Sequence, residues 1–573
     1  MSRVKLERRP LLGEPTGWSD AVPIILQRIY AARGVFGPEQ AEHRLTRLLS
    51  PQQLGGMSEV VALLAQAIHD DASIIIAGDY DCDGATGTAV AVRGLRMLGA
   101  RRVDYVVPNR FVHGYGLTPE LVASLPTHAQ LVVTVDNGIA SLAGVAAAQA
   151  RGIRVIVTDH HLPGERLPAA DAIVNPNVHG DDFPSKSLAG VGVMFYVLLA
   201  LRAHLRELGR FAANAEPDLS TLLDLVALGT VADLVPLDFN NRVLVEAGMK
   251  RIRSHRACAG ITALIEASQR SVSTLCTSDL GYAVGPRLNA AGRLEDMRLG
   301  VESLLTDDPV QARRYAELLS SINQERRDLQ AAMVAEAEAM VASAAGIDTQ
   351  SVGVTLFEPS WHAGVVGLVA SKLKERLHRP VIAFAPAGED APELLRGSAR
   401  SISGFHIRDA LAAVDARHPG LIERFGGHAM AAGLSLRAQD YSRFAAAFDA
   451  VAREWLNEEQ LQAVLYTDGE LPAGMFTLDM ARMLRFAGPW GQAFPEPLFD
   501  NRFECFNWRQ MGERHLRLSL RDPRDDALYD AVMFNAYDGQ PPPTMLRAAY
   551  ELTINDWQGR ESPRLLLRHI EPA

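Results

Sequence analysis

The amino-acid sequence predicts an α/β protein with a doubly wound parallel-sheet core, a long connecting helix, a smaller α/β domain and a C-terminal all-β barrel. Three observations predict this architecture. Short apolar runs alternate with helical stretches from about residue 57 to residue 238, as strands and crossover helices do in a parallel sheet. One helical pattern covers residues 309–345, and five strand-like segments follow residue 458.

A chain of 573 residues is too long for a single hydrophobic core. We expect an N-terminal extension with a helix at 22–33, and four further parts. The expected limits are 1–50 for the extension, 51–308 for the first α/β domain, 309–345 for the connecting helix, 346–457 for the second α/β domain and 458–573 for the barrel.

Apolar periodicity locates the individual elements. Strands of the first domain are expected at 74–77, 103–107, 131–135, 154–158 and 172–174. In the second domain, strands at 352–357 and 380–385 flank a helix at 364–377, and glycine-rich segments at 397–401 and 426–428 are expected to be turns. Barrel strands are expected at 502–506, 515–520, 529–534, 548–554 and 564–570. Phe503, Phe506, Trp508 and Phe534 are candidates either for stacking on bases or for the barrel core.

Composition indicates a cytoplasmic protein without membrane association. Four cysteines without paired spacing suggest a reducing compartment and no zinc site. The first nine residues are too charged for a signal peptide, and the longest apolar stretch, 191–201, is too short to span a bilayer. A net charge of −11 argues against broad binding of duplex nucleic acid, but it is compatible with a narrow groove that has local arginines.

Acidic and imidazole side chains follow three of the expected strands. Asp79, Asp81 and Asp83 come after the run at 74–77, and an extended backbone would place all three on one side before a helix that begins near Ala85. Asp136 follows the run at 131–135, and Asp159-His160-His161 follows the run at 154–158. Because the carboxyl ends of parallel strands share one edge, these groups should converge there, where a divalent cation would relieve their repulsion. Asp233, at the end of an apolar helical stretch, is a further candidate ligand, and Asp224 in the same stretch is the weaker choice.

These motifs resemble those of the DHH phosphoesterase superfamily, in the same order: 79–84, 136–138, 159–161 and 229–233. Residues 108–117 and 285–293 resemble the RecJ branch of single-stranded-DNA exonucleases, and 424–428 resembles the DHH-associated domain. The resemblance covers nearly the whole chain. It implies a DHH catalytic domain, a DHH-associated domain and an OB-fold-like barrel that binds nucleic acid.

The resemblance also implies a mechanism: metal-dependent hydrolysis of single-stranded DNA from the 5′ end, processive and releasing mononucleotides, in DNA repair and recombination. Two divalent cations, Mn²⁺ or Mg²⁺, would be held by Asp81, Asp83, Asp136, His160 and Asp233, with Asp136 as the bridging ligand and Asp79 in support. His161 would stabilise charge on the phosphate, and Asp159 would orient an imidazole.

Seven further residues are candidates for binding nucleic acid or its terminal phosphate: Arg110, Tyr115, Arg287, Asn289, Ser398, Arg400 and His428. Arginine offers a planar fork that matches phosphate oxygens, and Tyr115, between two glycines, offers a stacking face. A monomer is expected, with single-stranded DNA as substrate and with a single-strand-binding protein and a helicase as candidate partners.

Three alternatives stay open. A small-substrate phosphodiesterase, acting on oligoribonucleotides or cyclic dinucleotides, would use the same metals, although such enzymes resemble only the two α/β domains. A non-enzymatic relative, like the degenerate DHH protein of eukaryotic replicative helicases, would lack the metal ligands. A pyrophosphatase of the superfamily would carry histidine where this chain has Ala77.

Overall fold

The structure is a computed structural model, and it describes residues 4–109, 113–212, 215–342, 351–388, 391, 393–537 and 539–573. The chain divides into two compact units. The large unit comprises residues 8–323 and 467–573, and the small unit comprises residues 1–7 and 324–466. Each unit has its own sheet and core.

The large unit contains the expected parallel sheet, with strand order β3-β2-β4-β5-β6. All neighbouring strands run parallel. The strands are β2 (Ile74–Ala77), β3 (Val103–Val106), β4 (Leu131–Val135), β5 (Arg154–Thr158) and β6 (Ala172–Val174), which confirms all five predicted strands. From β2 the chain continues to β3 on one side, and then to β4 on the other side of β2. The carboxyl ends of β2 and β4 therefore form a topological switch point, where open α/β sheets bind their ligands.

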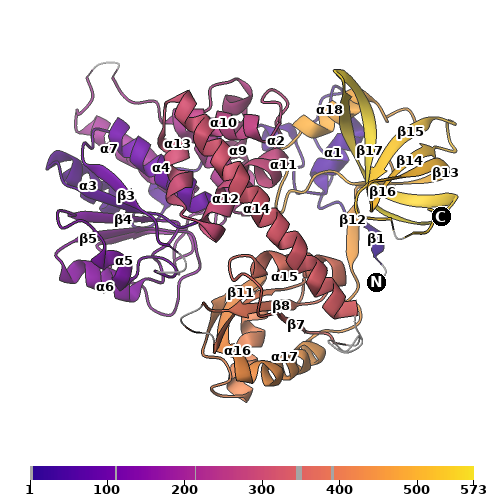
Figure 1. The fold of residues 1–573 in the computed structure, drawn as a ribbon. Coiled ribbons are helices and arrows are strands. Elements are labelled where there is room, and N and C mark those ends of the chain that lie inside the picture. The colour runs from indigo at the N-terminus through magenta and orange to yellow at the C-terminus, as the bar shows by residue number, and fades with distance from the viewer. Residues whose placement is uncertain are drawn as a thin grey trace. The chain divides into compact units, whose positions relative to one another are not determined.

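Helices cover both faces of this sheet (Figure 1). One face carries α3 (Met57–His69), α4 (Cys82–Met97) and α7 (Gly190–Glu207), and the other carries α5 (Pro119–Ala123) and α6 (Leu142–Ala150). Alternate strand residues supply the two cores, with Ile74 and Val133 toward α4 and α7, and Ile75 and Val132 toward α5 and α6. The near-continuous apolar runs of the strands follow from this burial on both sides.

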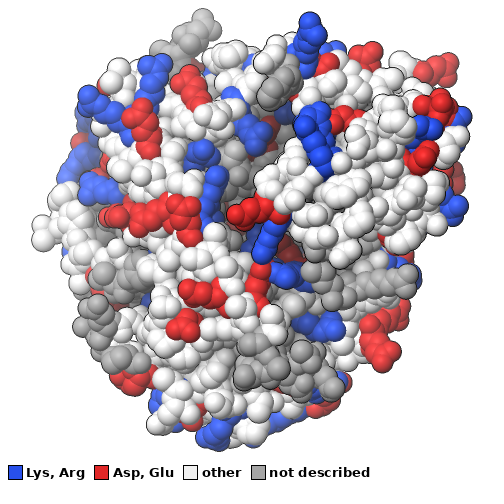
Figure 2. Space-filling view, turned by 45° about the vertical axis from the view of Figure 1, so that its right-hand side comes forward, with Lys and Arg blue, Asp and Glu red and all other residues white. Residues whose placement is uncertain are grey.

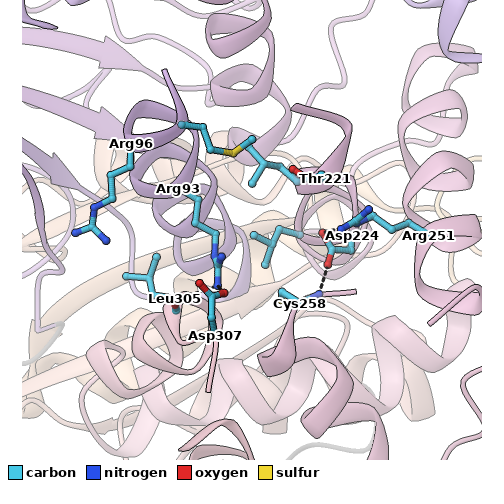
Figure 3. A pocket seen from close by; sticks show the side chains of 11 residues that line it. Arg93, Arg96, Thr221, Asp224, Arg251, Cys258, Leu305 and Asp307 are labelled. Carbon is cyan, nitrogen blue, oxygen red and sulfur yellow. Dashed lines mark hydrogen bonds and ion pairs between the residues drawn. The ribbon is translucent and has the colours of Figure 1, made fainter. Parts of the chain in front are cut away.

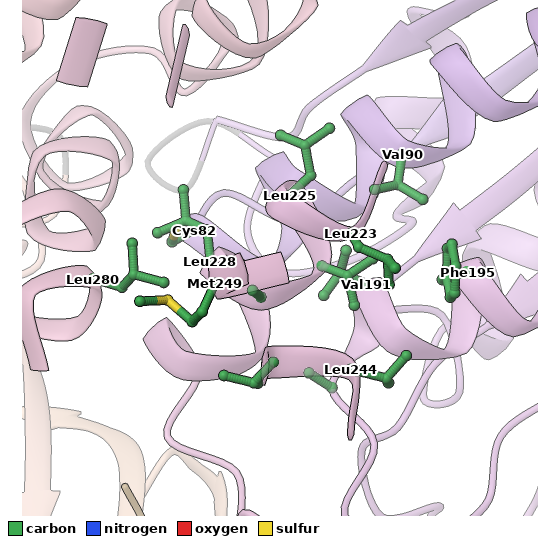
Figure 4. Close-up of a cluster of buried hydrophobic side chains, with 14 of the residues drawn as sticks. Cys82, Val90, Val191, Phe195, Leu223, Leu225, Leu228, Leu244, Met249 and Leu280 are labelled. Carbon is green, nitrogen blue, oxygen red and sulfur yellow. The ribbon is translucent and has the colours of Figure 1, made fainter. Parts of the chain in front are cut away.

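A helical layer packs against α4. Its helices are α8 (Leu223–Ala232), α9 (Phe239–Arg253), α10 (Ala259–Ala267), α11 (Thr277–Asp279), α12 (Gly285–Leu294) and α13 (Arg298–Leu305). Figure 4 shows the apolar contact between these helices, with Leu228 of α8 and Met249 of α9 in the same cluster as Cys82 of α4. Gly229 allows α8 to lie very close to α4, because a Cβ there would stand 2.2 Å from Thr86 Oγ1. The N-terminal extension contains α1 (Ile24–Ala31) and α2 (Pro38–Ala41), which come before the sheet in the chain.

The long helix α14 (Pro309–Ala342) continues from the large unit into the small unit. Its apolar residues recur at helical spacing, and Ala312, Ala316 and Leu319 are buried. The prediction of one unbroken helix here is confirmed.

The small unit contains a mixed sheet of order β10-β11-β9-β8-β7. Its strands are β7 (Val354–Phe357), β8 (Val381–Pro386), β9 (Leu394–Arg400), β10 (Arg424–Gly427) and β11 (Ala431–Arg437); its further helices are α15 (Val366–Leu377), α16 (Ile407–Arg417) and α17 (Tyr441–Trp455). The expectation of turns at 397–401 and 426–428 is wrong over most of both segments, since they belong largely to β9 and β10. Gly397 is a packing residue, because a Cβ there would lie 2.4 Å from the ring of Phe384.

The C-terminal part forms a closed barrel, ordered β13-β14-β15-β17-β16. Its strands are β13 (Phe499–Met511), β14 (His515–Arg521), β15 (Leu528–Met533), β16 (Met545–Trp557) and β17 (Arg560–Pro572), and α18 (Leu478–Phe486) precedes them. Phe503 is fully buried in the barrel core, so it offers no stacking face, whereas Phe506 and Phe534 are 55% and 57% exposed. A two-stranded pair, β1 (Lys5–Arg8) and β12 (Val464–Thr467), lies where the chain passes between units.

On the face of the molecule in Figure 2, charged side chains are dispersed rather than gathered by sign. Figure 2 shows Lys and Arg interspersed with Asp and Glu on the face in view. This agrees with a net charge of −11 and with local rather than global attraction of nucleic acid. None of the helices within the described ranges has the length and apolar character that crossing a membrane requires.

Candidate metal centre

Carboxylates and imidazoles converge at the carboxyl ends of β2, β4 and β5. Three overlapping groups have potential ligand atoms within 4.8 Å of one another: Asp79, Asp81 and Asp136; Asp83, His160 and Asp233; and Asp136, His160 and His161. Asp136 and His160 each belong to two groups. The site therefore offers overlapping sets of potential ligands for a divalent cation.

The first strand end differs from the sequence prediction. Helix α4 begins at Cys82 rather than near Ala85, with Asp81 as its N-cap, whose Oδ1 accepts a hydrogen bond of 3.0 Å from Gly84 N–H. The expectation that Asp79, Asp81 and Asp83 lie on one side of an extended segment is therefore wrong. The turn into the helix leaves Asp79 and Asp81 in one group and carries Asp83 into another.

Asp83 is fixed by the start of α7. Its two carboxylate oxygens accept hydrogen bonds from the backbone N–H groups of Gly190 and Val191, at 2.6 and 2.8 Å. These donors and the helix N-terminus favour the charged form. Burial, and then the nearby charge of Asp81, outweigh them and raise the pKa of Asp83 to about 7.

Asp136 lies at the centre of the cluster, at the end of β4. Its Oδ1 is 3.0 Å from His160 Nε2, and Asp233 Oδ2 is 3.5 Å from the same nitrogen. The backbone of Asp136 is left-handed, with φ 62°, and Gly190 leaves it room, because a Cβ at Gly190 would lie 2.4 Å from Asp136 Cβ. This conformation turns the carboxylate into the cluster.

The electrostatics of the cluster fit a divalent cation. Burial, followed by the charges of the neighbouring carboxylates, raises the pKa of Asp136 and of Asp233 well above the usual range. Asp136 Oδ1 is buried and, beside its 3.0 Å ion-pair contact with His160 Nε2, accepts no hydrogen bond from the described residues. Carboxylate oxygens with imidazole nitrogen are a donor set that suits Mn²⁺ or Mg²⁺, and such a cation would supply the missing positive charge.

Asp159 organises the loop that follows β5. Its Oδ1 lies 2.8 Å from His161 Nδ1 and accepts the backbone N–H groups of His160 and His161, while Oδ2 accepts Ile139 N–H. Burial alone would raise the pKa of Asp159, but the hydrogen bond and charge of His161 lower it overall. Burial would likewise lower the pKa of His161, yet Asp159 raises it to about 9. Asp159 is thus placed to orient the His161 ring.

Three asparagines that sequence reasoning missed hold the strand ends together. Asn137 Nδ2 donates to the carbonyls of Ala77 and Val135, which joins the ends of β2 and β4. After β6, Asn175 Nδ2 donates to His161 O at 2.8 Å and Asn177 Nδ2 donates to His160 O at 2.6 Å. The sequence offered a signal for Asn175 and Asn177. Both come just after β6, as the acidic residues come just after β2, β4 and β5.

Two more candidate residues lie close to the cluster, and one cannot be placed. The Tyr115 hydroxyl is 3.4 Å from the His161 ring nitrogens and from Asp136 O, and the residue is 47% exposed. Asn289 on α12 accepts the backbone N–H of Cys82 through Oδ1, at 2.8 Å, so it supports the start of α4. Arg110 lies outside the described residues.

The remaining candidates are not part of this cluster. Arg287 on α12 donates to Ser320 Oγ at 3.0 Å and to the carbonyls of Ala283 and Ala267. In the small unit, Arg400 donates to Ser398 Oγ at 3.0 Å and to Ser371 Oγ at 3.2 Å, and burial lowers its pKa. His428 is exposed at the end of β10.

The doubly wound sheet, its aspartate–histidine cluster and the closed barrel define a DHH-type α/β protein with an OB barrel. Three family models agree. The DHH family N-terminal domain model matches residues 73–230, the DHHA1 domain model matches 349–454, and the RecJ OB domain model matches 467–569.

Comparison with known proteins identifies the branch. The single-stranded-DNA-specific exonuclease RecJ of Dickeya dadantii (strain 3937) is 52% identical over 578 residues, which covers 99% of each chain. The chain belongs to the RecJ family of single-stranded-DNA-specific exonucleases.

Two solved structures support the same assignment. Crystal structures of RecJ from Thermus thermophilus, in complex with Mn²⁺ and with Mg²⁺, match with TM-scores of 0.81 and 0.76 at 30% and 28% identity. Each alignment covers 100% of this chain, and 80% and 78% of those chains respectively.

Proposed function

We propose that this protein is a metal-dependent exonuclease that degrades single-stranded DNA from the 5′ end, releasing mononucleotides processively in DNA repair and recombination. The observation that carries the proposal is the cluster of overlapping ligand groups at the switch point of the sheet. Similarity to RecJ along the whole chain supports the choice of substrate. The proposal includes the 5′-to-3′ direction of degradation, its processivity and the mononucleotide product.

Asp81, Asp83, Asp136, His160 and Asp233 are the proposed ligands of two divalent cations, Mn²⁺ or Mg²⁺. Asp136 is the proposed bridging ligand, which its membership of two of the groups supports. Asp79 is buried in the same group as Asp81, and we assign it a supporting role. When bound, such cations activate water as a nucleophile and stabilise charge on the phosphate.

The chain's own groups would position the scissile phosphate. The His161 imidazole, held at Nδ1 by Asp159, would donate a hydrogen bond from its other ring nitrogen to a phosphate oxygen. The Tyr115 ring, half exposed beside His161, would stack on the adjacent base. Burial of the carboxylates would keep bulk water away from the reacting phosphate.

Recognition of the strand and of its end would use separate groups. Arg400 is a half-buried guanidinium whose hydrogen bonds, in the described part of the chain, go to hydroxyls and a backbone carbonyl, which suits it to a terminal phosphate. In the small unit, Ser398 and His428 are proposed to assist Arg400. In the large unit, Arg287, Asn289 and Arg110 are proposed as separate contacts to the strand. On the barrel, exposed Phe506 lies under Arg521, with 4.6 Å between guanidinium and ring centroid, and this pair would bind bases and phosphates of the strand.

We further propose that the protein acts as a cytoplasmic monomer, with a single-strand-binding protein and a helicase as partners that prepare the substrate. The domain limits 1–50, 51–308, 309–345, 346–457 and 458–573 are part of the same proposal. The ranges of the three family models support the two α/β domains and the barrel.

Digestion of oligonucleotides tests the proposal. The substrates are single- and double-stranded, labelled at either end, and incubated with Mn²⁺, with Mg²⁺ or with a chelator. We expect labelled mononucleotide to appear early from the 5′-labelled single strand, only with metal, and slowly or not at all from the duplex. Cleavage in the presence of the chelator, or initial release from the 3′ end, would overturn the proposal.

A further inference from the structure

An apolar groove lies on the surface of the large unit, between α13 and the first part of α14. Its volume is about 450 Å³, and its lining residues come from 295–302 and 315–322, so they all belong to this unit. On α14, Tyr315, Leu318 and Ile322 have the spacing i, i+3 and i+7, which places them on one face of the helix. Leu299 of α13 completes the apolar lining. The groove is separate from the metal centre, because none of the candidate metal ligands lines it.

The apolar face of α14 in the groove is not the face that the core uses. Ala312, Ala316 and Leu319 are buried in the main hydrophobic core of the large unit. Tyr315 and Leu318 belong to none of the hydrophobic cores that the described residues form, and Leu318 is 50% exposed. An exposed apolar surface with a polar rim is typical of a site that binds another protein.

The rim of the groove is acidic. Its charged residues are three carboxylates and one guanidinium, which leaves two negative charges in excess: Glu295, Asp296, Glu302 and Arg298. In the described part of the chain, the Glu295 carboxylate makes no hydrogen bond or ion pair. The Asp296 carboxylate accepts the backbone N–H of Arg298 at 2.8 Å, and Glu302 accepts the Tyr105 hydroxyl at 2.6 Å. Both donors are uncharged, so the negative charge of the rim stays in place. The Arg298 guanidinium lies over the Tyr105 ring, 6.0 Å from its centroid.

A cavity lined by α4, α8 and α9 shows the contrast. There Asp307 accepts a hydrogen bond from Arg93 at 2.8 Å, and Asp224 accepts the backbone N–H of Cys258 at 2.6 Å and pairs with Arg251 at 3.8 Å. Figure 3 shows both carboxylates beside these partners. The chain itself supplies the cations in that cavity, so its carboxylates call for no charge from outside. The carboxylates of the groove differ in this respect.

Charge and shape together specify the occupant of the groove. Two excess negative charges repel phosphates, so the groove does not suit a DNA strand. Its apolar face suits a large apolar side chain, and a helix face with apolar residues at i, i+3 and i+7 is a common element of peptide recognition. The acidic rim complements lysine or arginine on either side of that side chain, and such rim charges select the partner.

We propose that this groove docks a segment of a partner protein in which lysine or arginine residues flank a leucine or another large apolar side chain. The apolar side chain would pack on Leu318, and the cations would face Glu295. Glu295 directly follows α12, whose Asn289 accepts the backbone N–H of Cys82 at the start of α4. A docked partner would therefore lie beside the metal centre without occupying it.

Fluorescence anisotropy with labelled peptides and the full-length protein tests this. The probe is a short peptide of alternating lysine and leucine. In one control peptide glutamate replaces lysine, and in the other serine replaces leucine. We expect the lysine–leucine peptide to bind, and each control peptide to bind at least about tenfold more weakly, because it lacks either the charge or the apolar contact. Equal binding of the three peptides, or no binding of the lysine–leucine peptide, would overturn the inference.

Two pairs of variants locate the binding. Leu318→Ser should weaken binding of the lysine–leucine peptide about tenfold. Val310→Ser is its matched control, because Val310 is 55% exposed on the same helix but does not line the groove. Glu295→Gln should weaken binding about two- to fivefold, and its control is Glu317→Gln, which changes an exposed carboxylate of α14 outside the groove. Equal losses in a variant and its control would mean general attraction to the surface, and would overturn the inference.

Two further measurements separate the other occupants. Exonuclease activity on free oligonucleotides should be unchanged in all four variants, which also shows that they fold. Weaker binding of a single-stranded oligonucleotide by Leu318→Ser would assign the groove to the DNA strand. Self-association of the wild type that Leu318→Ser abolishes, measured by sedimentation, would assign it to a second copy of the chain. Either result would overturn the inference.

Discussion

Two sets of buried carboxylates in the large unit differ in what faces them. At the metal centre, Asp83, Asp136 and Asp233 face one another and a pair of imidazoles, and their pKa values are raised. In the segment that leads into the barrel, the equally buried Asp468 receives two hydrogen bonds from Arg33, at 2.6 and 2.9 Å.

The difference separates structural from functional charge. Asp500 follows the structural pattern, since Arg547 donates to it twice, at 2.9 and 2.6 Å. A fold that needs a buried carboxylate for its own stability supplies a cation from its own chain. Carboxylates that face one another without a cation from the chain carry unbalanced negative charge, which a bound metal cation can neutralise.

The largest expected effect comes from removing one charge at the metal centre. Asp136→Asn keeps the shape and tolerates the left-handed backbone, but it removes the shared ligand. We expect cleavage to fall by more than the ~100-fold that loss of a residue supporting a metal ligand costs. The thermal midpoint of the metal-free protein should stay the same or rise, because repulsion is relieved. Cleavage rates and thermal unfolding in chelator measure both; near wild-type cleavage would contradict the comparison.

Removing one structural carboxylate should lower stability and leave the cleavage rate unchanged. Asp468→Ala leaves Arg33 buried without its partner and should lower the free energy of unfolding by about 3–5 kcal/mol. Molecules that are still folded should cleave at the wild-type rate, since the metal centre is intact. Urea unfolding and single-turnover cleavage check this. A loss of stability below ~1 kcal/mol would mean that the two sets of carboxylates do not differ in the way described.

A smaller effect is expected from the asparagines that hold the histidine loop. Asn177→Ala removes the hydrogen bond to His160 O and should weaken Mn²⁺ binding about 10- to 100-fold, with activity restored by excess Mn²⁺. Asn501→Ala is the matched control, because Asn501 makes a similar clamp to Leu471 in the barrel and should affect stability alone. Equal Mn²⁺ affinity in both variants would contradict a positioning role for Asn177.

Arg400, in the small unit, extends the comparison to a half-buried cation without a carboxylate partner among its hydrogen bonds in the described part of the chain. Arg400→Ala should weaken binding of 5′-phosphorylated strands about tenfold, and binding of 5′-hydroxyl strands much less. Arg396→Ala is the control, since Arg396 lies on the same strand but is exposed. Affinities need to be compared at one salt concentration, because general phosphate contacts are salt-dependent. Equal losses on both substrates would assign Arg400 to the strand backbone or to the fold.

The sequence predicted the parallel sheet well because buried parallel strands are unbroken apolar runs, and four of the five strands match residue for residue. The sequence-based prediction was wrong where one residue type is typical of two different local structures. Gly397 was interpreted as a turn residue, although its small size serves packing against Phe384. The start of α4 at Cys82 was missed because alternation of acidic residues suggested a strand, whereas Asp81 is an N-cap.

The candidate site was predictable in its ligand types but not in its support. The rule that ligands follow strand ends identified the aspartates and histidines. Asn175 and Asn177 were missed because an asparagine after a strand is also typical of an ordinary turn. Which hydrogen bond each makes depends on long-range packing of β6 beside β5, and no local pattern specifies it. In the barrel, Phe503 and Phe506 stand three residues apart on one strand, so their side chains point to opposite faces; the structure shows that Phe503 is the one that faces the core.

The most direct test of this unbalanced negative charge is the effect of Mn²⁺ on stability without any substrate. A cation that binds only the folded protein raises the free energy of unfolding, by about 2.7 kcal/mol at 100 times its dissociation constant. We predict such a rise for the wild type and for Asp500→Asn, each relative to its own metal-free state, and its loss in Asp136→Asn. An equal rise in Asp136→Asn, or no rise in the wild type, would contradict the claim that these carboxylates form a cation site.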